Sequence, residues 1–429
     1  MVILSSYTQM SSENATKMST FTLPLGIDSL EIRSQTVDKQ GNIIFDVVSK
    51  NTCTTCRKCG KPATKRHGLG DVIKVRHLPI LDQPVYLRIQ VIRYECTFCD
   101  DHTTTSEQYD WMERKSKTTK GLDIYINRQL IHSTIEDVGK KAQITSELIE
   151  SALKRSIKTS VNWSMYTNIE TIGIDEIALK KGHNNYVTIV SAKDLDGALS
   201  VIGVLPDRLK ETVKSFLESI PEHLKKTVKS VCTDMYDGFV KSAEEVFGKR
   251  VVVIDRFHVS KLYREPLDTL RINEMKRLKS TLSKVDYAKC EGMMWIIRRN
   301  HECLSKQDKV ALEFIYKHSP LLKEAHKTAL KLTNIFNTHQ SRKKALTKLN
   351  RWIKRVQENK ISCFNGFVKT LERYKFNILN YFKNRKNSGF AEGLNNKIKV
   401  LKRRCYGISK PESLFQRLLL DLLGYKIFA

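Results

Sequence analysis

The spacing of apolar positions along the chain changes several times, and each change predicts a different kind of secondary structure. After Phe21 the apolar residues fall in short runs that alternate with polar ones, which is typical of β-strands. From about residue 118 the spacing becomes that of amphipathic helices. The expected elements are strands at 43–48, 71–78 and 85–94 and helices at 124–131, 135–142 and from 145 onward.

A second change begins at Thr171, where three apolar runs follow one another, separated by turn-like segments. Helical and strand-like runs then alternate. The expected elements are strands at 171–179, 186–193 and 198–205, a helix at 209–220, a strand at 228–234, a helix at 236–247 and a strand at 250–255. This β-β-β-α-β-α-β order predicts a mixed sheet with helices on its faces, and it matches the ribonuclease H-like fold.

The rest of the chain is predominantly helical. Between residues 262 and 379 no strand-like alternation interrupts a basic helical pattern, and further helices are expected at 390–404 and 412–425. Trp295 and Trp352 lie in this region, and we expect both to pack in a core.

Charge narrows the class of partner. The 429 residues include 74 Lys and Arg against 46 Asp and Glu, a net charge of +28 spread over most of the chain. This excess favours a polyanion, most simply DNA or RNA. We expect no membrane partner, because no run approaches the ~20 apolar residues of a bilayer span. The absence of a secretory signal pattern and the scattered cysteines fit a reducing, cytosolic location.

The N-terminal cysteines have the spacing of a structural metal site. Cys56 and Cys59 form one Cys-x-x-Cys pair, and Cys96 and Cys99 form a second. Four thiolates brought together by a β-hairpin suit the tetrahedral coordination of a structural Zn²⁺. We assign these four as ligands because the Cys-x-x-Cys-Gly form suits a tight turn, while a Cys53–Cys56 pairing is the competing assignment.

The helices predicted within 118–158 have the lengths and the short connection of a helix-turn-helix. In that interpretation the third helix enters a DNA groove and uses Lys154 and Arg155. A purely structural three-helix bundle fits the same pattern, and the sequence leaves both open.

These observations predict a mixed α/β fold: a ribonuclease H-like core with an α-helical insertion, preceded by a small β zinc ribbon and a helix-turn-helix bundle. The expected domains are a disordered N-terminus at 1–20, the β-rich zinc ribbon at 21–112, the helix-turn-helix domain at 113–165, the first part of the core at 166–260, the insertion at 261–380 and the C-terminal helices of the core at 381–429.

Two aspartates occupy equivalent places in the predicted core. Asp175 is expected to end the first strand and Asp234 the fourth, and these strands are neighbours in a ribonuclease H-like sheet. Both carboxylates would then meet at one sheet edge, where oxygen donors suit Mg²⁺ or Mn²⁺. Glu176 and Asp237 are rivals. Strand alternation points Glu176 to the opposite face, and Asp237 lies in the following turn or helix.

A third carboxylate, Glu392, stands at the head of the helix predicted at 390–404. The helical period places Leu394, Ile398 and Leu401 on a separate apolar stripe, which we expect to pack on the sheet. A lone acid in a basic row is repelled by DNA phosphates unless a divalent cation lies between them. A solvated basic helix with an incidental Glu is the alternative.

Three carboxylates from separate elements suit two Mg²⁺ or Mn²⁺ ions ~4 Å apart, one activating the attacking oxygen and the other stabilising the leaving oxygen. The cations expected to hold DNA beside Glu392 are Lys397, Lys399, Lys402, Arg403 and Arg404. Asp255 ends the fifth predicted strand, with Arg256 and His258 beside it. These residues could contact the scissile phosphate or orient a ligand carboxylate. A helix cap and a core histidine would explain them equally well.

Together these motifs resemble the bacterial insertion-sequence transposases of the ISL3 family, over about residues 22–425 and in the family's order. The motifs are Cys56-Arg-Lys-Cys-Gly with Cys96-Thr-Phe-Cys, Ile174-Asp-Glu-Ile-Ala-Leu-Lys-Lys-Gly-His183, Asp234-Met-Tyr, Asp255-Arg-Phe-His-Val259, Ser388-Gly-Phe-Ala-Glu-Gly-Leu-Asn-Asn-Lys-Ile-Lys399 and Arg403-Arg-Cys-Tyr-Gly407. The resemblance implies an Asp-Asp-Glu triad at Asp175, Asp234 and Glu392. Cys53 and residues 1–20 depart from the family's pattern.

The resemblance also implies a function. The protein would bind the inverted-repeat ends of its element in double-stranded DNA, cleave there with two divalent metals and join the freed ends to target DNA. A homodimer or larger assembly would hold two ends together. The alternatives are a ribonuclease H-like nuclease or resolvase that cuts without joining, and a zinc-ribbon DNA-binding regulator on an inactive transposase scaffold.

Overall fold

A computed structural model of the chain describes residues 25–428 apart from 180–185, 300, 386–388 and 406. The N-terminal segment 1–20 lies outside these described residues, as do His183 and Tyr406 of the motifs above. The chain divides into two compact units. The first comprises the chain up to Ile126 with Gly139–Ala152, and the second comprises Asn127–Val138 with the chain from Leu153 on.

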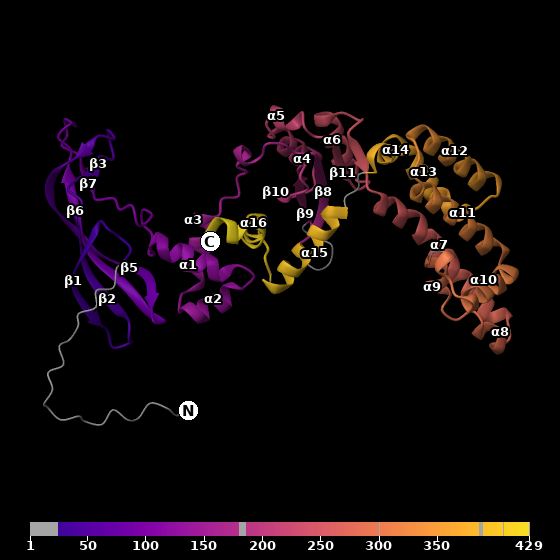
Figure 1. Ribbon diagram of the computed structural model, residues 1–429, viewed down its shortest axis with the longest axis horizontal. Coiled ribbons are helices and arrows are strands. Elements are labelled where there is room, and N and C mark those ends of the chain that lie inside the picture. The colour runs from indigo at the N-terminus through magenta and orange to yellow at the C-terminus, as the bar shows by residue number, and fades with distance from the viewer. Residues whose placement is uncertain (1–24, 180–185, 300, 386–388, 406, 429) are drawn as a thin grey trace, which may run out of the picture. The chain divides into compact units, whose positions relative to one another are not determined.

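The first unit is built on a five-stranded sheet (Figure 1). Its strands are β1 (Leu30–Val37), β2 (Ile43–Ser49), β5 (Lys65–Ile80), β6 (Gln83–Glu95) and β7 (Thr104–Ser106), and a separate pair joins β3 (Thr54–Thr55) to β4 (Pro62–Ala63). The order is β1-β2-β6-β5, with β7 also on β6; β2 and β6 are parallel and the other pairs antiparallel. Val75, Leu87 and Ile89 lie in its core with Trp111.

Strand β1 was not predicted from the sequence. All of its residues after Leu30 are exposed, although it pairs with β2 along its whole length. A strand without a buried face needs no alternation of apolar and polar residues, so the periodicity that reveals the other strands is missing here.

Three helices follow the first sheet: α1 (Lys120–Leu130), α2 (Ile135–Ala142) and α3 (Ser146–Ser156). Gln143 takes the left-handed conformation, with φ of 52°, in the short turn between α2 and α3. Helix α2 approaches this turn so closely that a Cβ on Gly139 would lie 2.9 Å from the carbonyl oxygen of Ile144. The predicted three helices and their tight connection are therefore present.

The second unit contains the predicted mixed sheet. Its strands are β8 (Thr171–Ala178), β9 (Tyr186–Lys193), β10 (Leu199–Leu205), β11 (Ser230–Thr233) and β12 (Val252–Ile254), in the order β10-β9-β8-β11-β12. The first three are antiparallel, while β11 is parallel to both β8 and β12. The prediction that the strands before Asp175 and Asp234 are neighbours is thus confirmed.

Helices cover both faces of this sheet. Its covering helices are α4 (Lys210–Glu218), α5 (Glu222–Lys225), α6 (Asp237–Phe247), α15 (Gly389–Arg404) and α16 (Pro411–Phe428), and a short 3₁₀ turn at Trp163–Met165 precedes β8. Along β8, Ile172 and Ile174 pack with α4 and α6, whereas Ile177 packs with α15 and α16. The predicted stripe of Leu394, Ile398 and Leu401 is buried in that second layer, as expected.

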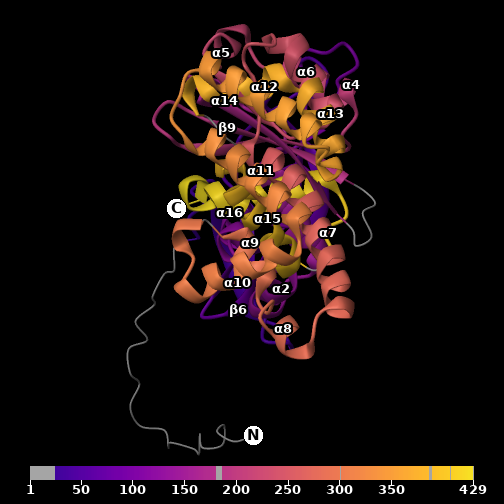
Figure 2. The same cartoon turned by 90° about the vertical axis from the view of Figure 1, so that its right-hand side faces the viewer.

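Between β12 and α15 the chain forms the predicted helical insertion. Its helices are α7 (Arg256–Thr281), α8 (Lys284–Ala288), α9 (Met293–Arg298), α10 (Lys306–His318), α11 (Pro320–Asn337), α12 (Arg342–Glu358), α13 (Asn365–Arg373) and α14 (Lys375–Asn384), with 3₁₀ turns at His301–Cys303 and Ser362–Phe364. Both views show α11 to α13 close together (Figure 2). Helix α14 returns to the sheet, where the Asn380 side-chain amide donates to the carbonyl oxygens of Lys249 and Val252, at 2.9 and 2.8 Å.

The two insertion tryptophans differ. Trp352 is buried, as predicted, and its Nε1 donates to the carbonyl oxygen of Thr328 at 2.8 Å. The prediction for Trp295 is wrong, because its side chain is 58% exposed. The short helix α9 buries Met293, Ile296 and Ile297, which leaves Trp295 on the outer side. Within the described residues, every helix is too short or too polar to cross a membrane.

Candidate functional site

The four predicted zinc ligands gather between two hairpin turns of the first unit. Cys56 and Cys59 lie in the β3–β4 turn, which Gly60 closes with a left-handed φ of 73° and a bond from its N–H to the carbonyl oxygen of Cys56, at 3.0 Å. Cys96 and Cys99 lie in the turn between β6 and β7. The tight turn expected from the Cys-x-x-Cys-Gly form is present.

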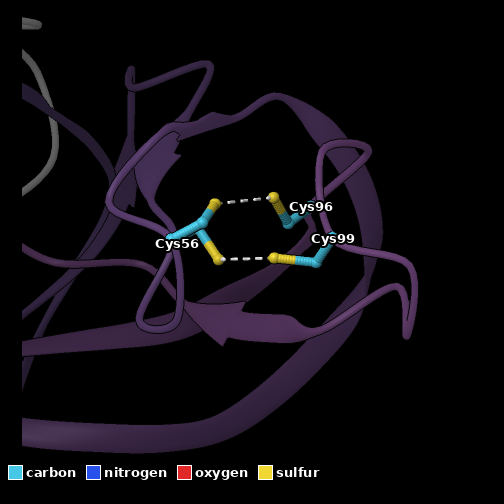
Figure 3. Close-up of side chains that lie close together, drawn as sticks. Cys56, Cys96 and Cys99 are labelled. Atoms are coloured by element: carbon cyan, nitrogen blue, oxygen red, sulfur yellow. Dashed lines mark hydrogen bonds between the residues drawn. The ribbon is translucent and has the colours of Figure 1, made fainter.

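Sulfur positions fit a tetrahedral metal. All four Sγ atoms lie within 4.8 Å of one another, with Cys56 and Cys99 at 3.8 Å and Cys59 and Cys96 at 3.5 Å. Four thiolates at ~2.3 Å from Zn²⁺ would have sulfurs about 3.8 Å apart. Figure 3 shows the Cys56, Cys96 and Cys99 side chains facing one another. Cys53 is exposed and outside this cluster, which argues against the competing pairing.

The electrostatics of the cluster also favour a cation. Backbone N–H groups of Cys59 and Lys58 lower the pKa of the Cys56 thiol to about 6. Burial raises the pKa of the Cys99 thiol to about 12. Neighbouring thiolates repel one another, so without a cation at the centre the four groups would not ionise together. The residues present thus fit a Zn²⁺ site.

In the second unit, Asp175 and Asp234 lie side by side at the point where two parallel strands part. The β8–β11 ladder runs from Thr171 opposite Ser230 to Ile174 opposite Thr233, and the two aspartates are the next residue on each strand. Neighbouring strands are about 4.8 Å apart. One expectation was wrong: Asp175 does not end its strand, because β8 continues to Ala178 by pairing with β9 beyond the end of β11.

These two carboxyl groups resist ionisation. Burial raises the pKa of Asp175, and burial together with the nearby Asp175 charge raises the pKa of Asp234. Backbone N–H groups act in the opposite direction: Glu176 donates to Asp175 Oδ1 at 2.8 Å, and Tyr236 donates to Asp234 Oδ1 at 3.0 Å. Within the described part of the chain, neither carboxylate has a Lys or Arg partner. Two adjacent half-buried carboxylates without such a partner form an arrangement that binds a divalent cation.

Helix α15 contributes a residue that the sequence analysis missed. The Asn395 side-chain amide donates to Asp175 Oδ2, and Asn395 is buried. Its only signal in the sequence is its position, three residues after Glu392 on a helix predicted to pack on the sheet. Glu392 belongs to α15, but its side chain lies outside the described part of the structure.

The rival carboxylates are held by cations of the protein itself. Glu176 accepts from Arg208 at 3.1 Å, and the Arg208 guanidinium also lies 5.0 Å from the ring centres of Tyr186 and Tyr236. Asp237 accepts from Arg373 and from the hydroxyl of Tyr374. These partners neutralise Glu176 and Asp237, so neither is as well suited to a metal as Asp175 and Asp234.

The three residues after β12 have different surroundings. Asp255 is buried and caps α7 by accepting from the Phe257 N–H at 3.0 Å. Arg256 donates to Asn337 and, at 3.5 Å, to the Tyr381 hydroxyl, so it binds within the insertion. The charge of His258 lowers the pKa of both Asp175 and Asp234, which places this imidazole close to the pair. Of the three, His258 is the residue positioned to act on the site.

The predicted DNA-binding cations also divide. Lys402 donates to the carbonyl oxygen of Ala178, and Arg404 pairs with Asp421, so both serve contacts within the protein. The other cations are Lys397, Lys399 and Arg403, exposed on α15, and Lys154, exposed, and Arg155, half-buried, on α3.

Comparison with known proteins identifies the family. A family model described as transposase, of the ISL3 group of DDE transposases, matches residues 172–418. The chain is 27% identical over 365 residues to the transposase for insertion sequence element IS1001 of Bordetella parapertussis, which covers 85% of this chain and 87% of that protein. It is 22% identical over 391 residues, 86% of each chain, to the transposase for insertion sequence element IS1557 in two strains of Mycobacterium tuberculosis. The chain therefore belongs to the ISL3 family of insertion-sequence transposases.

Proposed function

We propose that this protein cleaves double-stranded DNA at the ends of its element and joins the freed 3′-hydroxyls to target DNA. Asp175, Asp234 and Glu392 would hold two Mg²⁺ or Mn²⁺ ions for both steps. The observation that carries this proposal is the pair of half-buried carboxylates on neighbouring strands, Asp175 and Asp234, which has no Lys or Arg partner among the described residues.

The free-energy cost of holding Asp175 and Asp234 together in their ionised forms supports a metal-binding role. Two carboxylates with raised pKa values oppose folding when both are ionised, and a divalent cation offsets both their mutual repulsion and their loss of hydration. The chain instead places its available cations, Arg208 and Arg373, on the neighbouring acids Glu176 and Asp237. The site is thereby kept open for an external cation.

Glu392 is proposed as the third carboxylate on the helical spacing. Residues three apart are neighbours on a helix surface, and Asn395, three positions later, contacts Asp175. The proposal also agrees with the family match, which spans residues 172–418 and so contains all three acids.

When bound, the two metals would activate the attacking oxygen and stabilise the leaving oxygen of the phosphodiester. The protein's own residues prepare the site. Asn395 donates to one oxygen of Asp175 and favours its ionised form, and His258 lowers the pKa of both aspartates. Exposed Lys397, Lys399 and Arg403 on α15 would bind the phosphate backbone on either side of the scissile bond.

Recognition of the element ends is proposed for the zinc ribbon and for the helix-turn-helix, in which α3 would present Lys154 and Arg155 to a DNA groove. Joining two ends in one event requires both ends to be held together, so we propose a homodimer or larger assembly acting in the bacterial cytoplasm.

The test uses labelled DNA carrying an element end. Glu392→Gln, Asp175→Asn and Asp234→Asn should each abolish cleavage and joining while leaving end binding intact, because each removes one ligand charge at nearly constant shape. Glu222→Gln is the matched control: it makes the same change on an acid whose side chain is 72% exposed and pairs with Lys225 on its own helix. Normal joining by the Glu392 variant would refute the triad.

The same assay separates the other functions. Cleavage without joining would identify a nuclease or resolvase. Binding without cleavage at any Mg²⁺ or Mn²⁺ concentration would identify a DNA-binding regulator.

A further inference from the structure

A basic groove in the helical insertion has no part in the proposed chemistry. It has a volume of about 730 Å³ and lies between α11 and α12. Its charged lining residues are Lys331, Lys348, Arg351, Lys354, Arg355 and Glu358. Five of these six side chains are cationic, so the groove has a strongly positive field.

The sequence of α12 extends that field along the helix. It carries seven Lys or Arg residues and a single acid between Arg342 and Glu358. The spacing of Lys344, Lys348, Arg351 and Arg355 places them on one face, about 16 Å long at 1.5 Å per residue. On the side of the helix away from this stripe, Leu349 and Ile353 are buried, and buried Trp352 lies beside the stripe and lines the groove.

This stripe is unfavourable for the isolated helix. Like charges three or four residues apart destabilise a helix by about 0.2–0.5 kcal/mol per pair. Only part of the repulsion is relieved in the protein: Arg355 pairs with Glu324 at 3.4 Å, and Lys354 pairs with Glu358 at 3.6 Å. Across the described part of the chain, Lys331, Lys348 and Arg351 have no acidic partner within 4.0 Å. An external polyanion would relieve the remainder.

We propose that this groove binds the phosphate backbone of double-stranded DNA, as a contact separate from the carboxylate site and from the ribbon and helix-turn-helix. Duplex DNA has one negative charge per ~1.7 Å of axis, so a 16 Å stripe passes about nine phosphates. The inference rests on the proposed function for the identity of the polyanion. Because Lys and Arg at a backbone do not read bases, the contact is independent of sequence.

The test removes the three unpaired cations together. Full-length protein with Lys331→Ala, Lys348→Ala and Arg351→Ala is titrated with a duplex of arbitrary sequence at several salt concentrations. Each lost phosphate contact lowers the slope of log affinity against log salt by about 0.9, so the expected decrease is about 2–3. The matched control removes three exposed cations of α10, with Lys306→Ala, Lys309→Ala and Lys317→Ala, and should leave the slope unchanged.

A second measurement does not depend on any variant folding. Lysine acylation of the wild-type protein followed by mass spectrometry should show that DNA protects Lys331 and Lys348 but not Lys306 and Lys309. An unchanged salt slope in the groove variant, or an equal decrease in the α10 control, would overturn the proposal. Protection of the groove lysines by polyglutamate but not by DNA would overturn it too, in favour of a protein partner.

Failure of this inference can be told apart from failure of the proposed function. The groove variant should still cleave and join at saturating DNA, because its carboxylates are unaltered. The Glu392→Gln variant should keep the full salt slope. If the wild-type protein failed to join DNA ends while the groove variant still showed the reduced salt slope, the transposase chemistry alone would be refuted.

Discussion

Replacing Asn395 with Ala should weaken the protein's response to Mg²⁺ while leaving its fold intact. The buried Asn395 amide donates to Asp175 Oδ2 and so favours the ionised form of a carboxyl group whose pKa burial has raised. Without this donor, the pKa of Asp175 rises further and protons compete better with the metal for the same oxygens.

The size of the effect follows from the type of bond. A hydrogen bond to a charged group is worth about 1.5–3 kcal/mol, and each 1.4 kcal/mol corresponds to a factor of ten in affinity. Losing an outer partner of a metal ligand costs about 10–100-fold in affinity or activity. We therefore expect the Mg²⁺ concentration for half-maximal cleavage to rise about 10–100-fold. The maximal rate at saturating Mg²⁺ should change much less.

The assay is cleavage of a labelled element end over a series of Mg²⁺ concentrations at several pH values. The defect should be largest at the acidic end of the range and should shrink as the pH rises, because proton competition then weakens. Asn396→Ala is the control, since Asn396 is the adjacent residue of α15 and is exposed. Alanine favours helix over asparagine by about 0.5 kcal/mol, so neither variant should melt at a much lower temperature.

Two results would refute this reasoning. An Asn395→Ala variant with the Mg²⁺ dependence of wild type would show that the amide does not support the metal ligand. An Mg²⁺ defect of equal size in Asn396→Ala would show that general damage to α15, rather than the bond to Asp175, is responsible.

Three further predictions concern stability. Asp234→Asn should raise the melting temperature of the metal-free protein near neutral pH, because burial raises the pKa of this carboxyl and its ionised form opposes folding; the gain should vanish as the pH falls towards the ordinary carboxyl range, and equal melting temperatures at neutral pH would contradict it. Cys56→Ser should lose bound zinc while Cys53→Ser retains it, as elemental analysis of the purified variants would show; retention by both would exclude the assigned ligand set. Gly139→Ala should lower the free energy of unfolding, measured with denaturant, by about 1–3 kcal/mol because its Cβ would lie 2.9 Å from a carbonyl oxygen. Gly121→Ala is the control: the nearest atom to its Cβ would be at 3.6 Å, so the free energy of unfolding should stay the same or rise by up to about 1 kcal/mol. The reverse order would refute the close approach of α2 to the turn.

Most of the second unit's sheet could be predicted because its strands are buried on both faces. Strands β8, β9 and β11 are buried along most of their length and rich in β-branched residues, and such segments can be recognised without knowing their neighbours. The placement of Asp175 and Asp234 on neighbouring strands was predicted from strand order alone. The apolar run also predicted the extent of β8 to within one residue, but the position of Asp175 inside the strand was not predicted, because the residues after it pair with β9 beyond the end of β11.

What the sequence could not show depends on contacts between distant segments. Asn395 looks like any polar residue in a basic helix until α15 is placed on the Asp175 face of the sheet. Likewise, the sequence predicts Arg404 to be a DNA-binding cation, and only the packing of α15 against α16 shows that it forms an ion pair with Asp421. The prediction for Trp295 was wrong because a six-residue helix can bury only one side, and three other apolar residues of α9 occupy that side.

The helical insertion is fixed to the sheet at both of its ends, and this has a consequence for how such proteins can diversify. It leaves β12 at Asp255, which caps α7, and comes back to the same strand through Asn380 on α14. Doubling the length of a segment whose ends are already fixed adds only about 0.6 kcal/mol of closure entropy. Helices could therefore be gained, lost or exchanged within the insertion while β8, β11 and α15, which carry the proposed site, keep their places.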